Sequence, residues 1–358
     1  MLKIMKFIFF SKSMWTETPR LRHQLASLLI NYQQKVIFFQ KPHYFWENKS
    51  IEMHSHGLLQ CLTTKQLIHH QLRLIEPLRY LNAHYEVSSI KSKNIITDED
   101  DVIINFNYDY YFIREIYKNN KIVTVINDDF IAQAKFFSGR HVANALEKTC
   151  KASDVVLTVS YPLIEQLSPW CNPQLFLPWA DVDYMEPTFN TLRNRVLLWA
   201  HIDGRIDFTL LENAALLRKN IEFYIVGPKA KNIIHAVESI SEKCKNIIVL
   251  PPQKLTELPI NSFFAAIIPY KNNVRDIEAI TASNKTFQLM TRGLPIVTHG
   301  TPYFLDHTAI MKSSCLNDFL KGIDLCFNNY DRLQASIKDL ISHNQPNNRY
   351  LQLLSYLK

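Results

Sequence analysis

Short apolar segments alternate with longer segments of helical pattern along almost the whole chain. Four of the apolar segments are KVIFFQ at 35–40, DVVLTVS at 154–160, IEFYIVGP at 221–228 and FFAAIIPY at 263–270. Their apolar residues run continuously, which is typical of strands buried on both faces of a parallel sheet. Strands that alternate with helices throughout predict an α/β fold with doubly wound sheets.

The same pattern places individual elements. In the first half we expect strands at 2–10, 35–40, 102–107, 121–130 and 154–160, helices at 21–32 and 141–151, and an extended segment at 51–63. In the second half we expect strands from 195 and at 221–228, 246–253, 263–270 and 294–298, a helix ending at Arg292, and helices between 316 and 357. Ser283 or Asn284 is the expected N-cap of the helix that ends at Arg292, and Gly293 is its expected stop.

The two series of strands and helices predict two domains. A chain of 358 residues with 47% hydrophobic composition is long enough to bury two cores. We place the N-terminal domain at 1–183 and the C-terminal domain at 184–340, with the boundary in the segment 174–184. The last residues, 341–358, are expected to form a helix that packs back on the N-terminal domain.

The composition excludes several kinds of site. Only seven glycines occur, and neither a GxGxxG nor a Walker phosphate loop is found. The six cysteines show no CxxC spacing, which argues against a zinc site and favours a reducing compartment.

The expected location is the cytoplasm. The apolar run at the N-terminus is too short for a signal peptide, and no stretch approaches the ~20 apolar residues of a membrane span. The net charge of +7, with aromatics such as Trp15 and Phe45, favours contact with the anionic inner face of the cytoplasmic membrane. No nucleic-acid partner is expected.

The segment 263–300 carries the main candidate site. It predicts a strand, a loop, a helix and a second strand, and ligands of such units bind beyond the carboxyl ends of the strands. Lys285 falls in the first turn of the helix, with Gln288 and Arg292 on the same face. A cation and an amide in that place suit a nucleotide diphosphate. The alternative is that these side chains only solvate an outer helix face.

Other polar residues are candidates for catalysis or metal binding. Asp128 and Asp129 end the predicted strand 121–130, so one of them is expected to face the site, although both residues can instead cap the next helix. His54 and His56 point the same way on an extended segment, but no carboxylate or cysteine accompanies them. Asp181-Val182-Asp183 has the spelling of a metal motif but lies in the expected linker. No metal site is predicted.

The segment 263–300 resembles the donor-binding segment of GT-B glycosyltransferases. In that family a strand ending in proline precedes a helix of the form K-x-x-E-x-x-x-x-G and an apolar strand that opens with proline. The corresponding residues here are Lys285, Gln288, Gly293 and Pro295. Gln288 replaces the family's glutamate, which accepts hydrogen bonds from the donor ribose; an amide oxygen still accepts but carries no charge.

Further segments carry the same resemblance. The loop with Trp15, Glu17 and Arg20 is similar to the W-x-E…R-P loop of bacterial glycosyltransferases that build capsule, lipopolysaccharide or teichuronic acid-like polysaccharides. Residues 200–207 resemble the family's G-x-I-D-x-R-x-D loop, with Ala200 or His201 in place of its glycine. Residues 174–184 resemble its interdomain linker.

The resemblance implies a GT-B fold, in which two Rossmann-like domains face each other across a cleft, with the acceptor bound by the first and the nucleotide sugar by the second. It implies a metal-independent glycosyltransferase (a hexosyl or related transferase) with no cofactor, acting on a carbohydrate or lipid-linked acceptor. The implied donor-binding residues are Arg205, Asp207, Gly227, Gln253, Pro269, Tyr270, Ser283, Asn284, Lys285 and Gln288. The implied acceptor-side residues are Trp15, Glu17 and Arg20.

Two points stay open at this level. Inversion at the anomeric carbon requires a general base, for which we select Asp128 or Asp129, whereas retention does not. A nucleotide-sugar epimerase and a catalytically silent GT-B-like binding protein are alternatives to the transferase.

Overall fold

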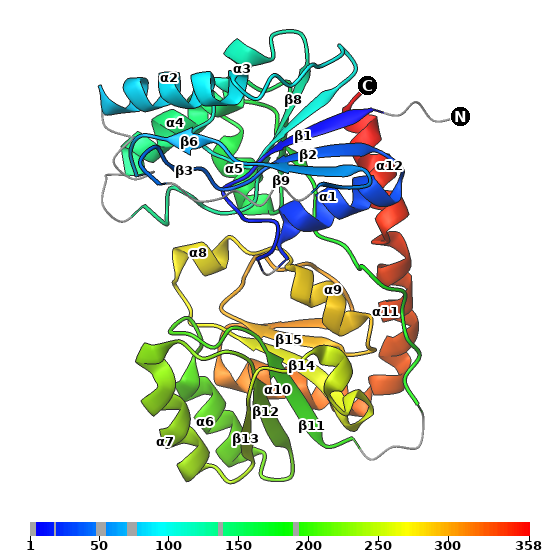
Figure 1. Cartoon of the computed structure of the whole chain (residues 1–358). Coiled ribbons are helices and arrows are strands. Elements are labelled where there is room, and N and C mark those ends of the chain that lie inside the picture. The colour runs from blue at the N-terminus through cyan, green and yellow to red at the C-terminus, as the bar shows by residue number, and fades with distance from the viewer. Residues whose placement is uncertain (1–4, 18, 48–54, 70–76, 135–138, 189–192) are drawn as a thin grey trace. The chain divides into compact units, whose positions relative to one another are not determined.

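The computed structural model describes residues 5–17, 19–47, 55–69, 77–134, 139–188 and 193–358 (Figure 1). The chain divides into two compact units. Unit 1 comprises Met1–Phe176 and Tyr350–Lys358, and unit 2 comprises Leu177–Arg349.

Unit 1 is built on an eight-stranded sheet in the order β10-β9-β8-β7-β1-β2-β5-β4. Every neighbouring pair is parallel except β4–β5. The strands are β1 (Lys6–Phe10), β2 (Lys35–Phe39), β4 (Ser55–His56), β5 (Leu59–Leu62), β7 (Val102–Asn105), β8 (Lys121–Ile126), β9 (Val155–Thr158) and β10 (Gln174–Leu175). A separate two-stranded ribbon pairs β3 (His43–Tyr44) with β6 (Lys65–Gln66).

The helices of unit 1 are α1 (Leu21–Asn31), α2 (Leu78–Lys91), α3 (Ile113–Ile116), α4 (Gly139–Lys151) and α5 (Tyr161–Leu167). Residues Phe7–Phe10 of β1 are all at most 2% exposed, so both faces of this central strand are covered. The continuous apolar runs of the sequence therefore predict the buried parallel strands correctly.

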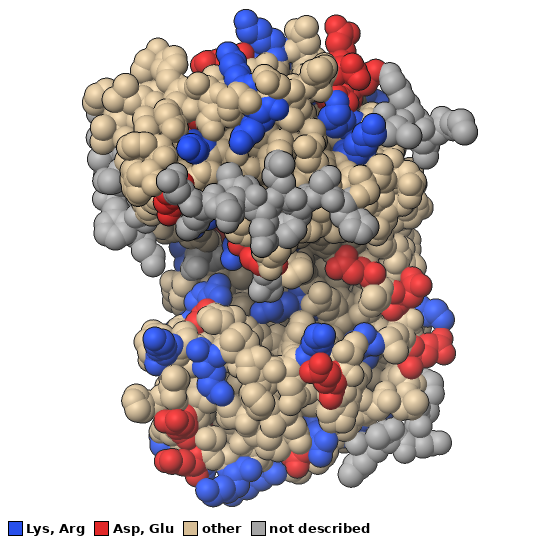
Figure 2. All heavy atoms as spheres, viewed as in Figure 1, with Lys and Arg blue, Asp and Glu red and all other residues tan. Residues whose placement is uncertain are grey.

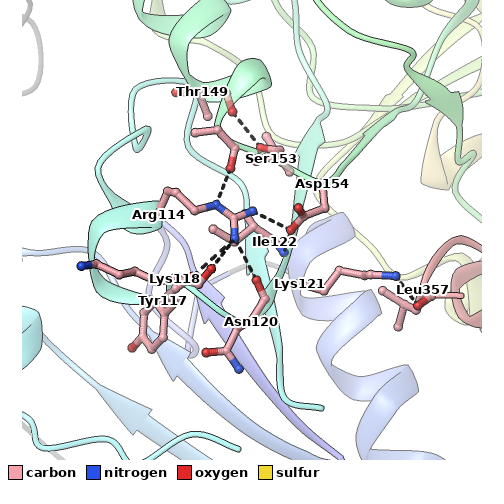
Figure 3. A network of polar contacts seen from close by, with 12 residues as sticks. Arg114, Tyr117, Lys118, Asn120, Lys121, Ile122, Thr149, Ser153, Asp154 and Leu357 are labelled. Carbon is pink, nitrogen blue, oxygen red and sulfur yellow. Dashed lines mark hydrogen bonds and ion pairs between the residues drawn. The ribbon is translucent and has the colours of Figure 1, made fainter. Parts of the chain in front are cut away.

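A polar network closes the amino-terminal side of this sheet, around Arg114 (Figure 3). The Arg114 guanidinium donates to Asp154 Oδ2 at 2.6 Å and to the carbonyl oxygens of Ala152 and Asn120 at 3.1 Å each. Asp154 Oδ2 also accepts the Ile122 N–H at the start of β8. Both charged groups thus have several partners among residues that only the fold brings together.

Unit 2 contains a six-stranded parallel sheet in the order β13-β12-β11-β14-β15-β16. Its strands are β11 (Arg195–Trp199), β12 (Glu222–Val226), β13 (Ile247–Leu250), β14 (Phe263–Pro269), β15 (Ile296–His299) and β16 (Ile310–Ser313). Its helices are α6 (Phe208–Leu217), α7 (Ile234–Lys243), α8 (Arg275–Glu278), α9 (Asn284–Met290), α10 (Leu316–Asn328) and α11 (Tyr330–His343).

The last helix, α12 (Pro346–Tyr356), starts in unit 2 and ends in unit 1. Within unit 1, the Tyr350 ring stacks on Tyr32, directly after α1, with centroids 3.9 Å apart, and its hydroxyl accepts a hydrogen bond from Gln34. These contacts attach the end of the chain to the first helix.

Several expected boundaries are wrong. The strand expected at 121–130 ends at Ile126, so Asp128 and Asp129 lie in the following loop. The described part of the segment expected to be extended at 51–63 does contain strands, but the chain reverses at Gly57 (φ +58°) to form the antiparallel pair β4–β5. The helix expected to end at Arg292 stops at Met290. Elements α8 and β16 are unexpected because their sequences carry no clear period.

Candidate functional site

The loop 200–207 of unit 2 joins β11 to α6. Backbone bridges connect this loop to the segments that follow the two strands beside β11. Ile202 forms a bridge with Lys229 beyond β12, and Ile206 forms one with Tyr270 beyond β14. Strands β12 and β14 flank β11 in the sheet. The loop is therefore fixed at the carboxyl edge, where open α/β sheets bind ligands.

Gly227 permits the close approach of this loop. Its φ is +148°, and a Cβ atom at this position would lie 1.8 Å from the carbonyl oxygen of Ala200. The Ala200 N–H in turn donates to Val226 O at 3.1 Å. The observed role of Gly227 is thus to let two loop backbones touch, and direct binding of a donor by this residue stays a prediction.

A cavity lies at the same edge of unit 2. Its cavity volume is about 40 Å³, within about 430 Å³ of empty space that includes open solvent. Its lining is Leu198, Trp199, Ala200, Ile267, Ile268, Tyr270, Ile280, Ser283, Lys285, Leu289 and Phe304. Mostly apolar walls with a few polar groups are typical of small-molecule sites. Of the predicted donor-binding residues, Tyr270, Ser283 and Lys285 line it.

Among the described residues, Lys285 is the one cationic side chain in this lining. It is half-buried and forms no hydrogen bond or ion pair with any residue that the structure describes. Burial, and next the nearby Arg205 guanidinium, lower the pKa of Lys285, while Asp203 partly opposes them. A half-buried ammonium that forms no hydrogen bond with a carboxylate is costly, so an anion in the cavity would stabilise it. The sequence alternative, an outer helix face in solvent, does not describe this side chain.

Arg205 is held in a fixed geometry by the same loop. Its Nε lies 3.0 Å and 3.1 Å from the two carboxylate oxygens of Asp203, and its Nη2 lies 2.7 Å from Asp203 Oδ2. The guanidinium carbon also lies 5.8 Å from the centroid of the Tyr270 ring. Arg205, Asp203 and Lys285 thus form one charged group of two cations and one carboxylate at the cavity.

Two of the predicted donor-binding residues are helix caps. The Ser283 hydroxyl accepts the Thr286 N–H at the start of α9, and Asp207 Oδ1 accepts the Leu210 N–H at the start of α6. Such caps stabilise helices by about 1 kcal/mol each. Their local role is sufficient to explain both residue types, and a role in donor binding stays a prediction.

The other predicted donor-binding residues lie around the cavity but not in its lining. Gln253 accepts the indole N–H of Trp199 with its carbonyl oxygen at 2.9 Å, which fixes that ring in the cavity wall. Pro269 accepts the Asp207 N–H with its carbonyl oxygen. Asn284 and Gln288 are half-buried on α9.

In unit 1 the two candidate carboxylates have different environments. Asp129 is buried, and its Oδ1 accepts the Ala132 N–H at 2.9 Å and the Gln166 side-chain N–H at 3.2 Å. Burial raises the pKa of Asp128, and the Arg22 and Arg20 guanidiniums partly oppose this rise. Asp129 therefore holds a turn and not the start of the next helix, which begins at Gly139, and Asp128 has the environment of a candidate base.

The loop after β1 carries the predicted acceptor-side residues. Trp15 packs its ring on Phe38, with centroids 5.2 Å apart, and on His23. Glu17 lies 3.7 Å from the Nε of Arg20, which is 63% exposed. Burial acts to raise the pKa of Glu17, but hydrogen bonds from Ser13 and the Met14 N–H and the charge of Arg20 lower it overall.

No group of three or more His, Cys, Asp or Glu side chains is arranged to hold a metal ion within the described parts of the chain. His54 and the side chain of His56 lie outside the described residues. Asp181 and Asp183 are both exposed.

The sequence did not predict all of the cavity. Trp199 was detectable in principle, because an aromatic residue directly precedes the loop at the end of a buried strand. Phe304 and Ile280 come from loops without a regular pattern, and only the fold brings them to Lys285. In unit 1, Arg22 was also missed as a candidate functional residue. A cation among the apolar residues of an expected helix was the available signal.

Comparisons with known proteins identify the fold. No protein-family model matches the sequence, and no curated protein matches it either. Among solved structures, sucrose-phosphate synthase from Thermosynechococcus elongatus is similar with a TM-score of 0.72, 10% identity, and coverage of 99% of this chain and 98% of the other. The structure of Anabaena HepE in complex with UDP-glucose is similar with a TM-score of 0.67, 12% identity, and coverage of 99% of each chain. WaaG, a glycosyltransferase involved in lipopolysaccharide biosynthesis, is similar with a TM-score of 0.56, 14% identity, and coverage of 95% of each chain.

These likenesses, which span nearly the whole chain, show an α/β fold of two Rossmann-like units of the GT-B glycosyltransferase type and confirm the predicted fold class. No helix in the described ranges is long and apolar enough to cross a membrane.

Proposed function

We propose that this protein is a glycosyltransferase that moves a sugar from a nucleotide-sugar donor to a carbohydrate or lipid-linked carbohydrate acceptor. The observation that carries the proposal is Lys285, a half-buried cation with no hydrogen bond or ion pair to the described residues, in a cavity at the carboxyl edge of unit 2. A donor diphosphate supplies the negative charge that this cavity lacks.

The proposed chemistry needs a stabilised leaving group. The acceptor oxygen forms a bond to the anomeric carbon while the bond from that carbon to the diphosphate oxygen breaks, and the diphosphate leaves with the electron pair. Lys285 and Arg205 are the groups proposed to stabilise its charge, so the reaction is proposed to need no metal. If the configuration inverts, Asp128 takes the proton of the acceptor hydroxyl, with help typically worth ~10²- to 10⁴-fold.

The solved structures support a transferase but give a broad range of acceptors. The similar HepE structure contains UDP-glucose, and WaaG takes part in lipopolysaccharide biosynthesis, whereas another similar structure is a sucrose-phosphate synthase. We place this chain in surface polysaccharide assembly because of the resemblance of its Trp15 loop. The proposed location is the cytoplasm, at the inner face of the membrane.

A donor screen tests the proposal directly. Thermal unfolding is measured with UDP, ADP, GDP and their sugar conjugates; a ligand present at 100 times its dissociation constant stabilises by about 2.7 kcal/mol. Positive donors are then incubated with and without candidate acceptors. Transfer supports the proposal, whereas conversion of the donor without an acceptor identifies an epimerase, and binding without any turnover identifies a silent binding protein.

The membrane contact is proposed from exposed aromatic residues in unit 1. Phe45 is 49% and Trp46 is 59% exposed, and the Trp46 ring stacks on Tyr44 with centroids 4.6 Å apart. Trp15, in contrast, is half-buried against Phe38 and is not part of this surface. On the face shown in Figure 2, basic and acidic side chains are interspersed instead of forming one basic patch. Aromatic side chains of this kind favour the interface of a bilayer.

Sedimentation with anionic liposomes at low salt checks this contact. We expect binding that falls with added salt and falls strongly when Phe45 and Trp46 are both changed to serine. Tyr303→Ser, at a position 48% exposed in unit 2, is the matched control and should bind as the wild type does. Equal binding of all three proteins would contradict the assignment of the surface.

A further inference from the structure

Buried polar atoms without a partner gather at one edge of unit 1. Among the described residues, these atoms include Thr63 Oγ1, Asn107 Nδ2, Asn127 Oδ1 and Thr158 Oγ1. Each follows or ends a strand of the parallel sheet, namely β5, β7, β8 and β9, respectively. Native proteins rarely leave such atoms unsatisfied, and Asn107, Asn127 and Thr158 follow or end three neighbouring strands, so this stretch of the carboxyl edge indicates a place for a polar ligand. Strands β1 and β2 separate Thr63 from that stretch.

Arg22 is the charged member of this group. Its residue is 8% exposed, and its Nε is buried with no hydrogen-bond partner. The described contacts of the guanidinium are one hydrogen bond from Nη1 to Ser13 Oγ at 3.0 Å and the Phe106 ring, 5.6 Å away. Asp128 and Glu17 act on its charge from a distance, and neither forms an ion pair within 4.0 Å.

Comparison with Arg114 shows how unusual this is. The less buried Arg114 donates to an aspartate and to four backbone carbonyl oxygens (Figure 3). Arg22 is more deeply buried, yet most of its five N–H groups have no acceptor among the described residues. A buried cation without an ion pair costs free energy, which a bound oxyanion would offset through the planar fork of donors.

The backbone around Arg22 favours the same ligand. Arg22 lies in the first turn of α1, a helix of 11 residues with no acidic residue in that turn. The His23 ring accepts the N–H of Arg20 just before the helix, but no N-cap side chain accepts an N–H of the first turn. The first turn of a helix attracts anions because its N–H groups are unsatisfied. The turn itself is buried, so a ligand there is desolvated.

We infer that the acceptor saccharide carries an oxyanion, either a phosphate ester or a carboxylate, that binds to Arg22 at the start of α1. The unsatisfied atoms of Asn107, Asn127 and Thr158 are placed to bind hydroxyl groups of the same sugar. The inference rests on the proposed transferase function, because it names the class of the acceptor. The oxyanion binds by charge and hydrogen bonds, and no covalent step is involved.

Binding without turnover tests this site separately from the transferase function. The melting temperature of the full chain is measured with glucose 6-phosphate, glucuronate, inorganic phosphate and neutral glucose. Saturating UDP keeps these anions out of the Lys285 cavity; if UDP does not bind, Lys285→Ala is used for the same purpose. We expect at least one of the two anionic sugars to raise the melting temperature more than glucose does. The sugar with the larger effect shows whether the oxyanion is a phosphate ester or a carboxylate.

Substitution of Arg22 gives the decisive result. Arg22→Met should weaken binding of the anionic sugar about 10- to 100-fold, and Arg22→Lys, which keeps the charge but not the fork, should weaken it less. The unliganded Arg22→Met protein should melt at the same temperature as wild type or higher, because an unpaired buried charge is removed. Arg114→Met is the control, with a lower melting temperature and unchanged anion binding.

Two results would overturn the inference. One is an equal response to glucose and to every anion in the wild type. The other is anion binding that survives unchanged in Arg22→Met; a loss of thermal stability like that of Arg114→Met would then make Arg22 a structural residue. Neither result depends on whether UDP binds, so the transferase proposal is judged separately.

Discussion

Replacing Lys285 by alanine tests the role of the unit 2 cavity. The side chain forms no hydrogen bond or ion pair with the described residues, so the substitution removes only the longer-range attraction between its ammonium group and Asp203. A charge-assisted hydrogen bond to a phosphate is worth about 1.5 to 3 kcal/mol, which corresponds to roughly 10- to 100-fold in affinity. We therefore expect weaker binding of the donor without loss of fold.

The lowered pKa of Lys285 adds a pH dependence with a definite sign. The folded protein releases this proton at a lower pH than the unfolded chain, so the unfolded state binds more protons between the two pKa values. Stability of the free protein should rise with pH in that window, just below the ordinary lysine value of about 10.5. Donor affinity should fall over the same window, because the neutral amine no longer attracts phosphate.

Isothermal titration with the donor found in the screen measures the affinity, and thermal unfolding measures the stability. The control is Lys321→Ala, because Lys321 is 75% exposed on α10 of the same unit. Lys321→Ala should retain wild-type affinity. Wild-type donor affinity in Lys285→Ala would refute the reasoning, and so would a large fall in its melting temperature, which would show that the lysine serves the fold.

Two further predictions follow from the geometry. Asp128→Asn should reduce turnover of an inverting enzyme by about 10²- to 10⁴-fold without unfolding it. Asp129→Asn should mainly lower the melting temperature, because the Asp129 carboxylate accepts the Ala132 N–H. NMR of the product establishes its anomeric configuration, and full activity of Asp128→Asn with an inverted product would contradict the assignment. Gly227→Ala should destabilise the protein by at least about 2 kcal/mol in chemical denaturation, because its Cβ would meet a carbonyl oxygen at 1.8 Å, and Gly204→Ala, with no atom within 4 Å, should be nearly neutral. Equal effects at the two glycines would show that the loop moves aside.

The sequence predicted the architecture because its signals are local. Continuous apolar runs identified most strands of both sheets, although not β16, and Ser283 and Gly293 marked the region of α9, with Gly293 at φ +73°. Boundaries were less accurate, as for the strand that ends at Ile126, because the last hydrogen bonds of a strand depend on its neighbours and not on its own residues.

Part of the candidate site was also accessible from the sequence. Lys285 was identified from its spacing in the strand–loop–helix–strand pattern, and Asp128 and Asp129 from their place after a strand. The pattern did not distinguish between the two aspartates, since adjacent residues share the same local signal. The hydrogen bonds of Asp129 with Ala132 and Gln166, the latter 37 positions away, distinguish them.

The sequence alone thus determined the alternation of strands and helices and the strand ends at which polar residues gather, because both depend on residues close together in the chain. The tertiary structure decided which charges are paired. Arg114 meets Asp154 across 40 positions and is satisfied, whereas Arg22 is buried with a single hydrogen bond to Ser13. The free energy of a buried charge is set by desolvation and by every group around it, and these groups come from strands and loops that only the fold brings together.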